Sequence, residues 1–473
     1  MTSPSASSPS PGPADTHGFQ TVAPLPSRLS HQISAGGYLE SWTLGFTLVA
    51  IAIAMVAGLV VARVVAHRRG RRLLPGLPRS VVDGGVGVLS FLVLVAGVGV
   101  LVNAYAGYLP TLSTLFSPPG ATTVLPHTLL HNADDALRSR VIRIDIPGRH
   151  DGMNSGTTYV YVPPGYDQPV NATQRYPSVY LIHGFPGRAA DWFTAGQLQH
   201  TMDLLLKHHL VRPMIVVSPT ASTGYLDDDE CLDASTGRPL IEDYLVFDVV
   251  NAIDRTFRTL PNRAYRAFGG MSSGGYCALN IGIHHMHRFG IVLASEPYGT
   301  PGGNAFASTL HHDETLLRIN DVNWLIPHVK FSEPVSFFLD AGSRDLETKG
   351  ETYAIARGLA DRGQVVAYRA VGDVGHTWRE AERALPYALI FASQQFGHVA
   401  KGGSDAADAA RLRQLFELAR SELTGVSPFV SPSPSGSGSP SPSRSGGSPS
   451  PTVSPSSARR SRSPSPTPSS HSR

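Results

Sequence analysis

The sequence predicts an α/β fold with a mostly parallel sheet and helices on both faces, preceded by a two-helix transmembrane hairpin. Three observations lead to this prediction. Short β-branched runs alternate with longer amphipathic runs over residues 135–400. Two uncharged apolar stretches precede that block. Segments rich in Ser and Pro lie at both ends of the 473-residue chain, so the length divides between a hairpin, one globular domain and polar tails.

Composition sets the domain boundaries. From residue 426 the chain is almost entirely Ser, Pro, Gly and Arg, so it lacks the apolar surface that would offset the entropy of ordering. The first 26 residues have a similar bias. We therefore expect a flexible N-terminal segment (1–41), two transmembrane helices (about 42–66 and 84–109, within 42–110), a linker (111–134), the α/β domain (135–400), a C-terminal helix (401–425) and a disordered tail (426–473).

The first apolar stretch runs without a charge from Trp42 to Ala62, which is long enough to cross a hydrocarbon core of about 30 Å as a helix. The second stretch, 84–109, is also uncharged, and its glycines suit close packing against the first helix. The alternative is a pair of buried helices in a soluble protein. A cleavable signal peptide fits poorly, because the basic cluster follows the first apolar stretch.

The loop between the two stretches is strongly basic, whereas only Arg28 precedes the first stretch. The positive-inside rule places this loop in the cytoplasm, so both termini and the α/β domain are expected outside. The basic residues of the loop are Arg63, Arg68, Arg69, Arg71, Arg72 and Arg79. Few of the basic residues are Lys, and the residues Ala, Gly and Val are abundant. This composition hints at a high-GC bacterial source.

The net charge of +3 is small, and much of it comes from arginines of the tail without aromatic neighbours, so we expect no nucleic-acid partner. Within the α/β block the expected strands are 158–162, 178–183, 213–218, 264–269, 290–294, 335–340 and 365–371. The expected helices are 196–209, 242–259, 274–288, 349–362 and 378–396.

Residues 270–274 read Gly-Met-Ser-Ser-Gly and match the pattern GxSxG. The string alone is weak evidence in a chain rich in Gly and Ser. Its context strengthens it, because an apolar strand precedes it and a small-residue helix follows, as a nucleophile elbow requires. The helix N-terminus would also favour developing negative charge. Ser272 is therefore the predicted nucleophile, and the alternative is a loop or helix-capping serine.

A serine nucleophile needs a base and an orienting acid, which in this arrangement follow it in the order acid, then His. Asp345 lies just past the strand VSFFLDAG, and His376 lies past VVAYRAV. Asp340 and Glu347 are rival acids, and a surface histidine is the alternative for His376. Oxyanion donors are expected from the amides of Ser273 and Phe185, with His183 as a structural residue.

These motifs resemble the putative-esterase family of α/β-hydrolases, which includes esterase D, feruloyl esterase domains and mycobacterial mycolyltransferases. The resemblance covers about 160–395 and implies that Ser272, Asp345 and His376 form the catalytic triad. It does not cover the hairpin or the tail, and it does not select a substrate. The matching segments are LIHGFPG (181–187), Trp192, PMIVVSPT (213–220), GGMSSGGYCALN (269–280), LDAGSRD (339–345) and GHTW (375–378).

The expected reaction is hydrolysis of a carboxylic ester through an acyl-enzyme, with no organic cofactor and no metal. Tethering to a membrane favours an envelope lipid or an acylated glycan as the ester substrate. A mycolyltransferase-like acyltransferase would use the same triad, and a catalytically silent envelope-binding module is the alternative of another class. The oligomeric state stays open.

Two histidine clusters are candidate metal ligands, but neither shows a recognised ligand motif, so surface histidines are expected. The clusters are His284, His285 and His287, and His311, His312 and Asp313.

Cys231 and Cys277 are the chain's two cysteines, and they form either a disulfide or two buried thiols. A bridge would hold the acidic run 227–230 beside Ser272. That run is expected to be a solvated face of an insertion near the active-site edge.

Overall fold

The computed structural model describes residues 18–34, 36–70, 78–112, 114, 137–148, 156–237 and 239–425. The expected tail at 426–473, most of the expected linker and residues 71–77 of the basic loop lie outside these ranges. All described residues belong to one compact unit, Met1–Pro428.

The centre of the fold is an eight-stranded sheet of order β1-β2-β4-β3-β5-β6-β7-β8. Strands β1 and β2 pair antiparallel, β2 pairs antiparallel with β4, and the remaining neighbours pair parallel. This is the α/β-hydrolase fold expected from the sequence. The strands are β1 (Arg140–Ile146), β2 (Gly156–Val162), β3 (Ser178–Ile182), β4 (Ile215–Pro219), β5 (Arg266–Met271), β6 (Ile291–Ser295), β7 (Ser336–Gly342) and β8 (Val365–Val371).

Seven of these strands lie within about two residues of their expected positions, and β1 was missed. Strand β1 is an edge strand whose apolar residues alternate with Arg140, Arg143 and Asp145, so its run appears polar. The expected helix 242–259 is also interrupted. It consists of α7 (Ile241–Asp243), a π-helical segment (Tyr244–Val249) and α8 (Val250–Thr256).

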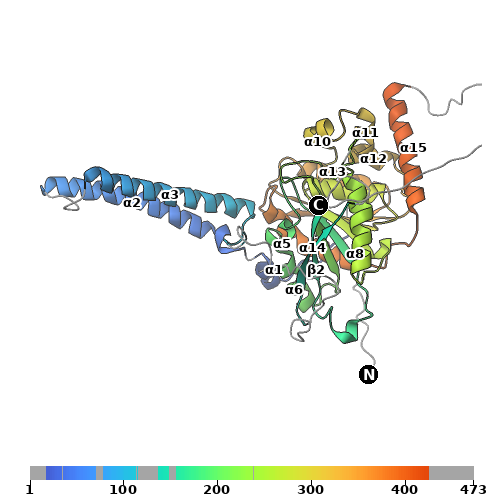
Figure 1. Cartoon of the computed structure of the whole chain (residues 1–473), viewed down its shortest axis with the longest axis horizontal. Helices are drawn as coiled ribbons and strands as arrows, with labels where there is room; N and C mark the ends of the chain where they lie inside the picture. Colours follow the sequence, from blue (N-terminus) through green and yellow to red (C-terminus); the bar gives the residue numbers. More distant parts are fainter. Residues whose placement is uncertain are drawn as a thin grey trace, which may run out of the picture. The chain divides into compact units, whose positions relative to one another are not determined.

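Helices cover both faces of the sheet (Figure 1). Helices α8, α9 and α13 contribute Ile253, Leu279 and Leu359 to one core, and α6 and α14 contribute Met202 and Leu389 to the other. The other helices of this domain are α5 (Asp191–Thr194), α6 (Leu198–Lys207), α9 (Ser273–His284), α10 (Gly303–Ser308), α11 (Glu314–Ile319), α12 (Val322–His328), α13 (Lys349–Asp361), α14 (Trp378–Gln395) and α15 (Asp405–Thr424).

Helices α2 (Trp42–Arg68) and α3 (Arg79–Ala106) pack against each other and are long and apolar enough to cross a membrane. Most of their side chains are exposed in the structure. A Cβ atom on Gly97 would lie 2.9 Å from the backbone nitrogen of Val49, so the helices approach closely at this glycine. The other glycines of α3 have open space around the Cβ position.

Residues 1–17 of the expected flexible segment lie outside the described residues, and residues 18–34 differ from that expectation because they pack against the domain. The amide of Gln20 donates to the carbonyl of Val366 in β8 at 2.7 Å, and Phe19 packs against Tyr353 and Tyr368. Helix α1 (Ser27–Ile33) buries Leu29 and Ile33, which lie one turn apart on one face. The compositional bias of the first residues concealed these few apolar side chains, which are enough to dock the segment onto the domain.

Candidate active site

Ser272 lies at a sharp turn between β5 and α9, with φ 56° and ψ −120°. This conformation is strained for a residue with a side chain, and it exposes the hydroxyl at the carboxyl edge of the sheet. The flanking glycines allow the turn. A Cβ on Gly270 would lie 2.3 Å from the carbonyl oxygen of Gly274, and a Cβ on Gly274 would lie 2.4 Å from that of Ile182. The GxSxG string therefore has the geometry of a nucleophile elbow.

The structure brings the three predicted triad residues together from three separate loops. The Oγ of Ser272 donates to Nε2 of His376 at 2.7 Å, and Nδ1 of His376 lies 3.1 Å from Oδ2 of Asp345. Asp345 follows β7, and His376 lies between β8 and α14. A proton on Nδ1 satisfies Asp345 and leaves Nε2 free to accept the serine proton. This is the arrangement that general-base activation of a serine requires.

Asp345 is buried and held in its ionised form. Its Oδ1 accepts the amides of Glu347 and Thr348 at 2.9 and 3.0 Å, and its Oδ2 accepts from the hydroxyl of Thr348. Burial alone would raise the pKa of this carboxyl, but the hydrogen bonds from Thr348, His376 and Glu347 lower the pKa below its ordinary value. A carboxylate fixed in this way can orient the imidazole of His376.

The two rival acids take other positions. Asp340 is buried within β7, where its Oδ1 lies 2.7 Å from Oγ of Ser295. Glu347 is exposed, and its contribution to the site is the amide that it donates to Asp345. Neither carboxylate contacts His376 among the hydrogen bonds of the described residues.

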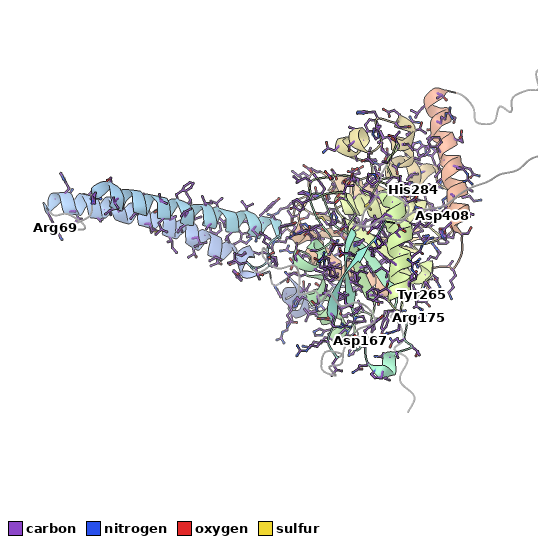
Figure 2. All side chains as sticks on the ribbon, in the orientation of Figure 1. Arg69, Asp167, Arg175, Tyr265, His284 and Asp408 are labelled. Carbon is purple, nitrogen blue, oxygen red and sulfur yellow. A yellow bond between two sulfur atoms is a disulfide. The ribbon has the colours of Figure 1, made fainter. Side chains whose placement is uncertain are left out.

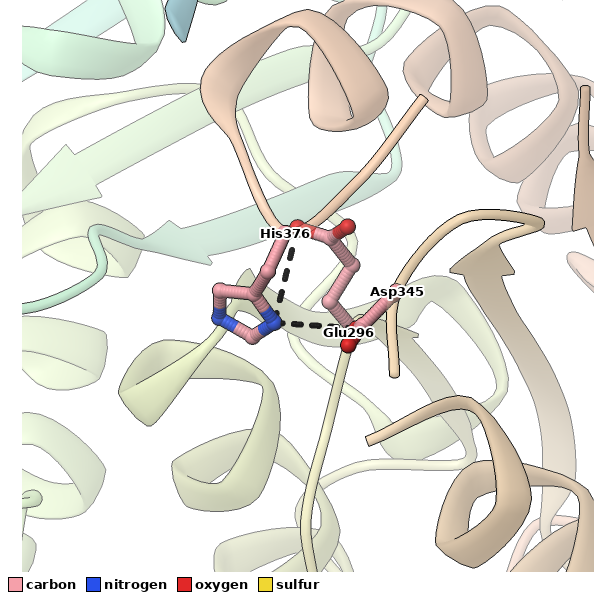
Figure 3. Close-up of side chains that lie close together, drawn as sticks. All are labelled: Glu296, Asp345 and His376. Atoms are coloured by element: carbon pink, nitrogen blue, oxygen red, sulfur yellow. Dashed lines mark hydrogen bonds and ion pairs between the residues drawn. The ribbon is translucent and has the colours of Figure 1, made fainter. Parts of the chain in front are cut away.

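Glu296 is a neighbour of the triad that the sequence analysis missed. Its Oε2 lies 4.0 Å from Nδ1 of His376 and accepts the amide of Thr377 at 3.0 Å (Figure 3). Complete burial, with Asp340 and Asp345 nearby, raises the pKa of Glu296 to about 10, so the side chain is a neutral acid at pH 7. Its position directly after β6 could have revealed it, because acids that follow parallel strands share one sheet edge.

Glu296, Asp345 and His376 also offer three ligand atoms within 4.8 Å of one another, a spacing that a metal ion could use. The two nitrogens of His376 face Asp345 and Ser272, and Glu296 is neutral. Both ring nitrogens of His376 are therefore already paired with the other two residues of the predicted triad.

The predicted oxyanion donors face one cavity of about 10 Å³, which has room for roughly one water molecule. Phe185 and Gly184 line one side, and Ser273 and Gly274 line another. A Cβ on Gly184 would approach Cβ of Ser272 to 3.2 Å, so this loop passes close to the predicted nucleophile. The nearby His183 is buried with Nδ1 2.9 Å from the carbonyl oxygen of Gly184, in keeping with a structural role.

The acidic run forms the remaining wall of this cavity. The structure joins Cys231 to Cys277 of α9 in a disulfide with a Cα–Cα distance of 5.6 Å, and this bridge holds the run beside the elbow. The expected solvated face is wrong for Glu230, which is buried and accepts the amide of Gly302 at 2.8 Å and the hydroxyl of Tyr298. Burial is the main cause that raises the pKa of Glu230 to about 7 and that of Asp228 to about 6.

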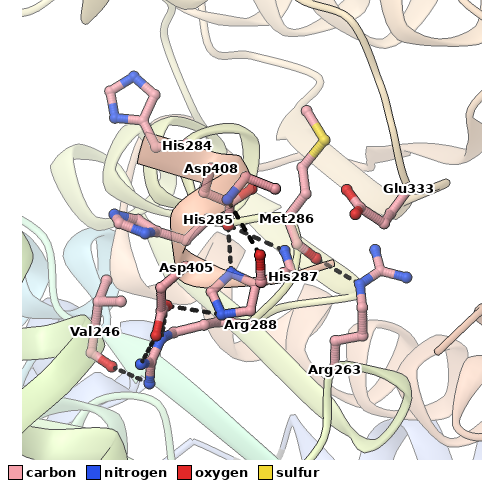
Figure 4. Close-up of polar contacts among 12 residues, drawn as sticks. Val246, Arg263, His284, His285, Met286, His287, Arg288, Glu333, Asp405 and Asp408 are labelled. Carbon is pink, nitrogen blue, oxygen red and sulfur yellow. Dashed lines mark hydrogen bonds and ion pairs between the residues drawn. The ribbon is translucent and has the colours of Figure 1, made fainter. Parts of the chain in front are cut away.

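His284 and His285 at the end of α9 are buried and His287 is half-buried, which corrects the expectation of surface histidines. His284 Nδ1 and His285 Nε2 lie 2.9 and 2.8 Å from the same carboxylate oxygen of Glu242. His287 contacts Asp405 and Asp408, which belong to the first turn of α15 (Figure 4). Figure 2 shows where His284 and Asp408 lie in the whole chain. These groups join α9 to two other segments of the chain and need no metal to be satisfied.

The second cluster consists of separate contacts. Nδ1 of His311 lies 3.0 Å from Oγ of Ser235, and the ring of His312 packs edge-on against Phe306. Asp313 caps the N-terminus of α11 through the amides of Thr315 and Leu316.

Residues 153–378 match the family model described as putative esterase. This segment belongs to the putative-esterase family. Among curated relatives, an uncharacterized protein of Corynebacterium glutamicum is 28% identical over 214 residues, which are 43% of this chain and 49% of that protein. An endo-1,4-beta-xylanase/feruloyl esterase of Xylanibacter ruminicola is 31% identical over 138 residues, 28% of this chain and 18% of that protein.

A solved ferulic acid esterase aligns with a TM-score of 0.47 at 23% identity, covering 55% of this chain and all of that chain. The chain spans about half the length of the Corynebacterium relative and a smaller share of the Xylanibacter protein.

Proposed function

We propose that this chain is a membrane-anchored serine esterase that hydrolyses a carboxylic ester outside the cytoplasm. The observation that carries the proposal is the hydrogen-bonded relay from Ser272 Oγ through His376 to Asp345. Membership of residues 153–378 in an esterase family supports the same reaction class. Ser272 is the nucleophile, His376 the general base and acid, and Asp345 the group that orients the imidazole.

In the first half-reaction, Ser272 Oγ bonds to the ester carbonyl carbon as its proton passes to Nε2 of His376. The amides of Ser273 and Phe185 donate to the oxyanion that forms. The carbon–oxygen bond to the leaving alcohol then breaks, and His376 returns the proton to that alcohol. In the second half-reaction, water attacks the acyl-enzyme with His376 again as the base, releasing the acid and the free serine.

The apolar hairpin supports anchoring, and the basic loop between α2 and α3 supports a cytoplasmic loop with the esterase domain outside. Cysteine accessibility in intact cells tests this topology. A cysteine in place of exposed Val170 should react with an impermeant reagent, and one in place of Arg69 should react only after lysis. The reverse pattern would place the esterase domain in the cytoplasm.

Transfer of the acyl group to an alcohol is the second candidate, because the same acyl-enzyme can be resolved by either acceptor. Hydrolysis of a chromogenic acyl ester by the full chain, with and without an added alcohol, separates the two reactions. We expect free acid as the main product and loss of turnover in Ser272→Ala. Predominant ester exchange would favour the acyltransferase, and turnover by Ser272→Ala equal to wild type would remove the proposed mechanism.

A further inference from the structure

The residues just before α2 and the last turn of α3 contact the segment that carries His376. Arg379, three residues after His376, donates from Nε to the carbonyl oxygen of Ala104 at 3.0 Å and from Nη2 to Glu40 at 3.4 Å. A Cβ on Gly375 would lie 2.9 Å from the hydroxyl of Tyr105. The last turn of α3 and the residues before α2 therefore pack against Gly375 and Arg379, which lie on either side of His376.

The segment after α3 also reaches the other loops of the site. The hydroxyl of Tyr108 donates to Oδ2 of buried Asp191 at 3.1 Å and lies 3.4 Å from the hydroxyl of Tyr225. Asp191 begins α5, just after the loop of Phe185, and Tyr225 belongs to the acidic insertion. Residues 104–108, at and after the end of α3, thus contact three parts of the site: the segment around His376, the start of α5 after the loop of Phe185, and the acidic insertion.

Exposed apolar side chains lie on the loop of Phe185, on the acidic insertion and on the loop of Asp345. Of the eight large apolar residues exposed in the described part of 137–425, four flank the site: Phe185, Tyr225, Leu226 and Leu346. Leu226 is 72% exposed and Leu346, which follows Asp345, is 92% exposed. Leaving such side chains in water forfeits the free energy of burial, so their positions on three loops that carry or adjoin site residues favour a surface that meets an apolar phase.

Aromatic residues mark where the hairpin would leave the hydrocarbon. Tyr38 and Trp42 at the start of α2, and Tyr105 at the end of α3, are exposed, and such residues are enriched at membrane interfaces. These positions lie within a few residues of Glu40, Ala104 and Tyr108, which contact the site's loops. Because only a few residues separate these contacts from the aromatic side chains, the loops that they reach lie near head-group level.

We propose that the hairpin docks the active site against the outer surface of its own bilayer and that the substrate is an ester carried by a membrane lipid. This inference rests on the proposed function and narrows it from envelope esters in general to lipids reached from the head-group region. Leu226 and Leu346 enter the interface, and the cavity beside Ser273 receives the ester carbonyl. A water-soluble ester uses the same triad without this contact.

The test uses the full chain in phosphatidylcholine vesicles with two fluorogenic esters of one acid, one anchored by a diacylglycerol tail and one water-soluble. Leu226→Ser/Leu346→Ser should lose about tenfold or more in kcat/KM on the anchored ester and stay within about twofold on the soluble ester. Val170→Ser, at an equally exposed position elsewhere on the domain, is the matched control and should lose neither activity.

Equal activity of the double variant and wild type on the anchored ester, or equal losses on both esters, would overturn the inference. Absence of hydrolysis of both esters by wild type would remove the proposed function, and the inference with it. A second measurement is independent of turnover. An environment-sensitive dye on Leu346→Cys should shift to the blue in vesicles and be quenched by spin-labelled lipid, whereas the dye on Val170→Cys should not. Identical spectra at the two positions would also overturn the inference.

Discussion

Helix α9 has a polar cluster at each end. The two clusters differ in whether a reactive partner and open space remain beside the histidine. At its N-terminus, His376 pairs with one carboxylate, and its other nitrogen faces a serine hydroxyl beside a cavity. At its C-terminus, His284 and His285 share Glu242, and the second nitrogen of His284 faces the carbonyl oxygen of Ile319 at 2.8 Å. The same two side-chain types serve chemistry where a reactive partner and space remain, and stability where every group is buried and paired.

The largest contrast should come from replacing one histidine in each cluster. His376→Ala should lower kcat/KM by about 10⁴-fold, because only binding and the oxyanion donors remain. Its melting temperature should fall less than that of His284→Ala, because the side chain of His376 is 27% exposed whereas His284 is buried. His284→Ala should show the opposite pattern, a lower melting temperature with kcat/KM within about threefold per folded molecule. A large loss of activity in both variants would break the distinction between the clusters.

Glu242→Gln tests the buried pair more directly. Removal of one charged partner should cost about 3–5 kcal/mol of unfolding free energy and leave kcat/KM nearly unchanged. Burial raises the pKa of Glu242, but His284 and His285 have the larger combined effect and bring the pKa below its ordinary value of 4.5. Burial lowers the pKa of His284, but Glu242 raises it above its ordinary 6.5.

The ion pair of Glu242 with His284 therefore gives its full stabilisation between pH 4.5 and pH 6.5, the ordinary pKa values of the two side chains. Its stabilisation declines as the pH falls through the lowered pKa of Glu242 or rises through the raised pKa of His284. Denaturant titrations at several pH values should show the largest gap between wild type and Glu242→Gln near pH 5–6. A gap independent of pH would contradict the ion pair.

The disulfide should stabilise the insertion on the catalytic side of α9. Its loop spans a sequence separation of 46, for which the chain-entropy relation gives a stabilisation of about 4 kcal/mol. Cys231→Ser/Cys277→Ser should lose up to this amount of unfolding free energy and change substrate preference more than turnover of a small ester. Non-reduced peptide mapping of the wild-type protein checks the bridge itself, and two free thiols there would remove it.

The pH dependence of stability tests whether Glu296, beside the proposed triad, is a neutral acid or a charged carboxylate. Its pKa of about 10 means that the folded protein keeps a proton that the unfolded chain releases above about 4.5, so this group costs stability as the pH rises. As the pH rises from 5 to 9, the unfolding free energy of Glu296→Gln should increase relative to wild type by up to about 1.4 kcal/mol per pH unit. Exposed Glu347→Gln is the control and should show no such slope, and a flat difference for Glu296→Gln would show that Glu296 is ionised.

The smallest effect should come from the acidic wall of the cavity. Asp227→Asn removes a charge from this wall and should raise kcat/KM for an anionic ester relative to a cationic one by about two- to fivefold at low salt. Asp361→Asn, an exposed carboxylate on α13, is the control. An unchanged ratio in Asp227→Asn would mean that the acidic run does not influence which esters approach the site.

Local patterns in the sequence pointed to Ser272, Asp345 and His376, which the structure brings together, because each residue follows a recognisable strand. Glu296 also follows a strand directly, so its place at the same sheet edge was open to prediction, but its raised pKa and its distance from His376 depend on how β6 lies beside β7. The histidines of α9 were misplaced for a similar reason. Their partners Glu242, Asp405 and Asp408 lie 42 or more positions away in the sequence, so burial of the cluster depends on tertiary packing.

Strand β1 and the N-terminal segment show the other limit of sequence patterns. Both lie at edges of the sheet, where few apolar residues are enough to dock a segment and polar neighbours obscure them. The central strands were predicted well because burial on both faces makes them continuously apolar.

Labelling of the full chain with a fluorophosphonate probe, followed by peptide mapping, tests the central claim most directly. An activated serine attacks phosphorus as it attacks an ester carbonyl, so the probe should modify Ser272 in wild type and in Glu242→Gln. Ser272→Ala should carry no label, and His376→Ala should be labelled far more slowly. A label on a different residue, or equal labelling of Ser272→Ala and wild type, would contradict the assignment of Ser272 as the nucleophile.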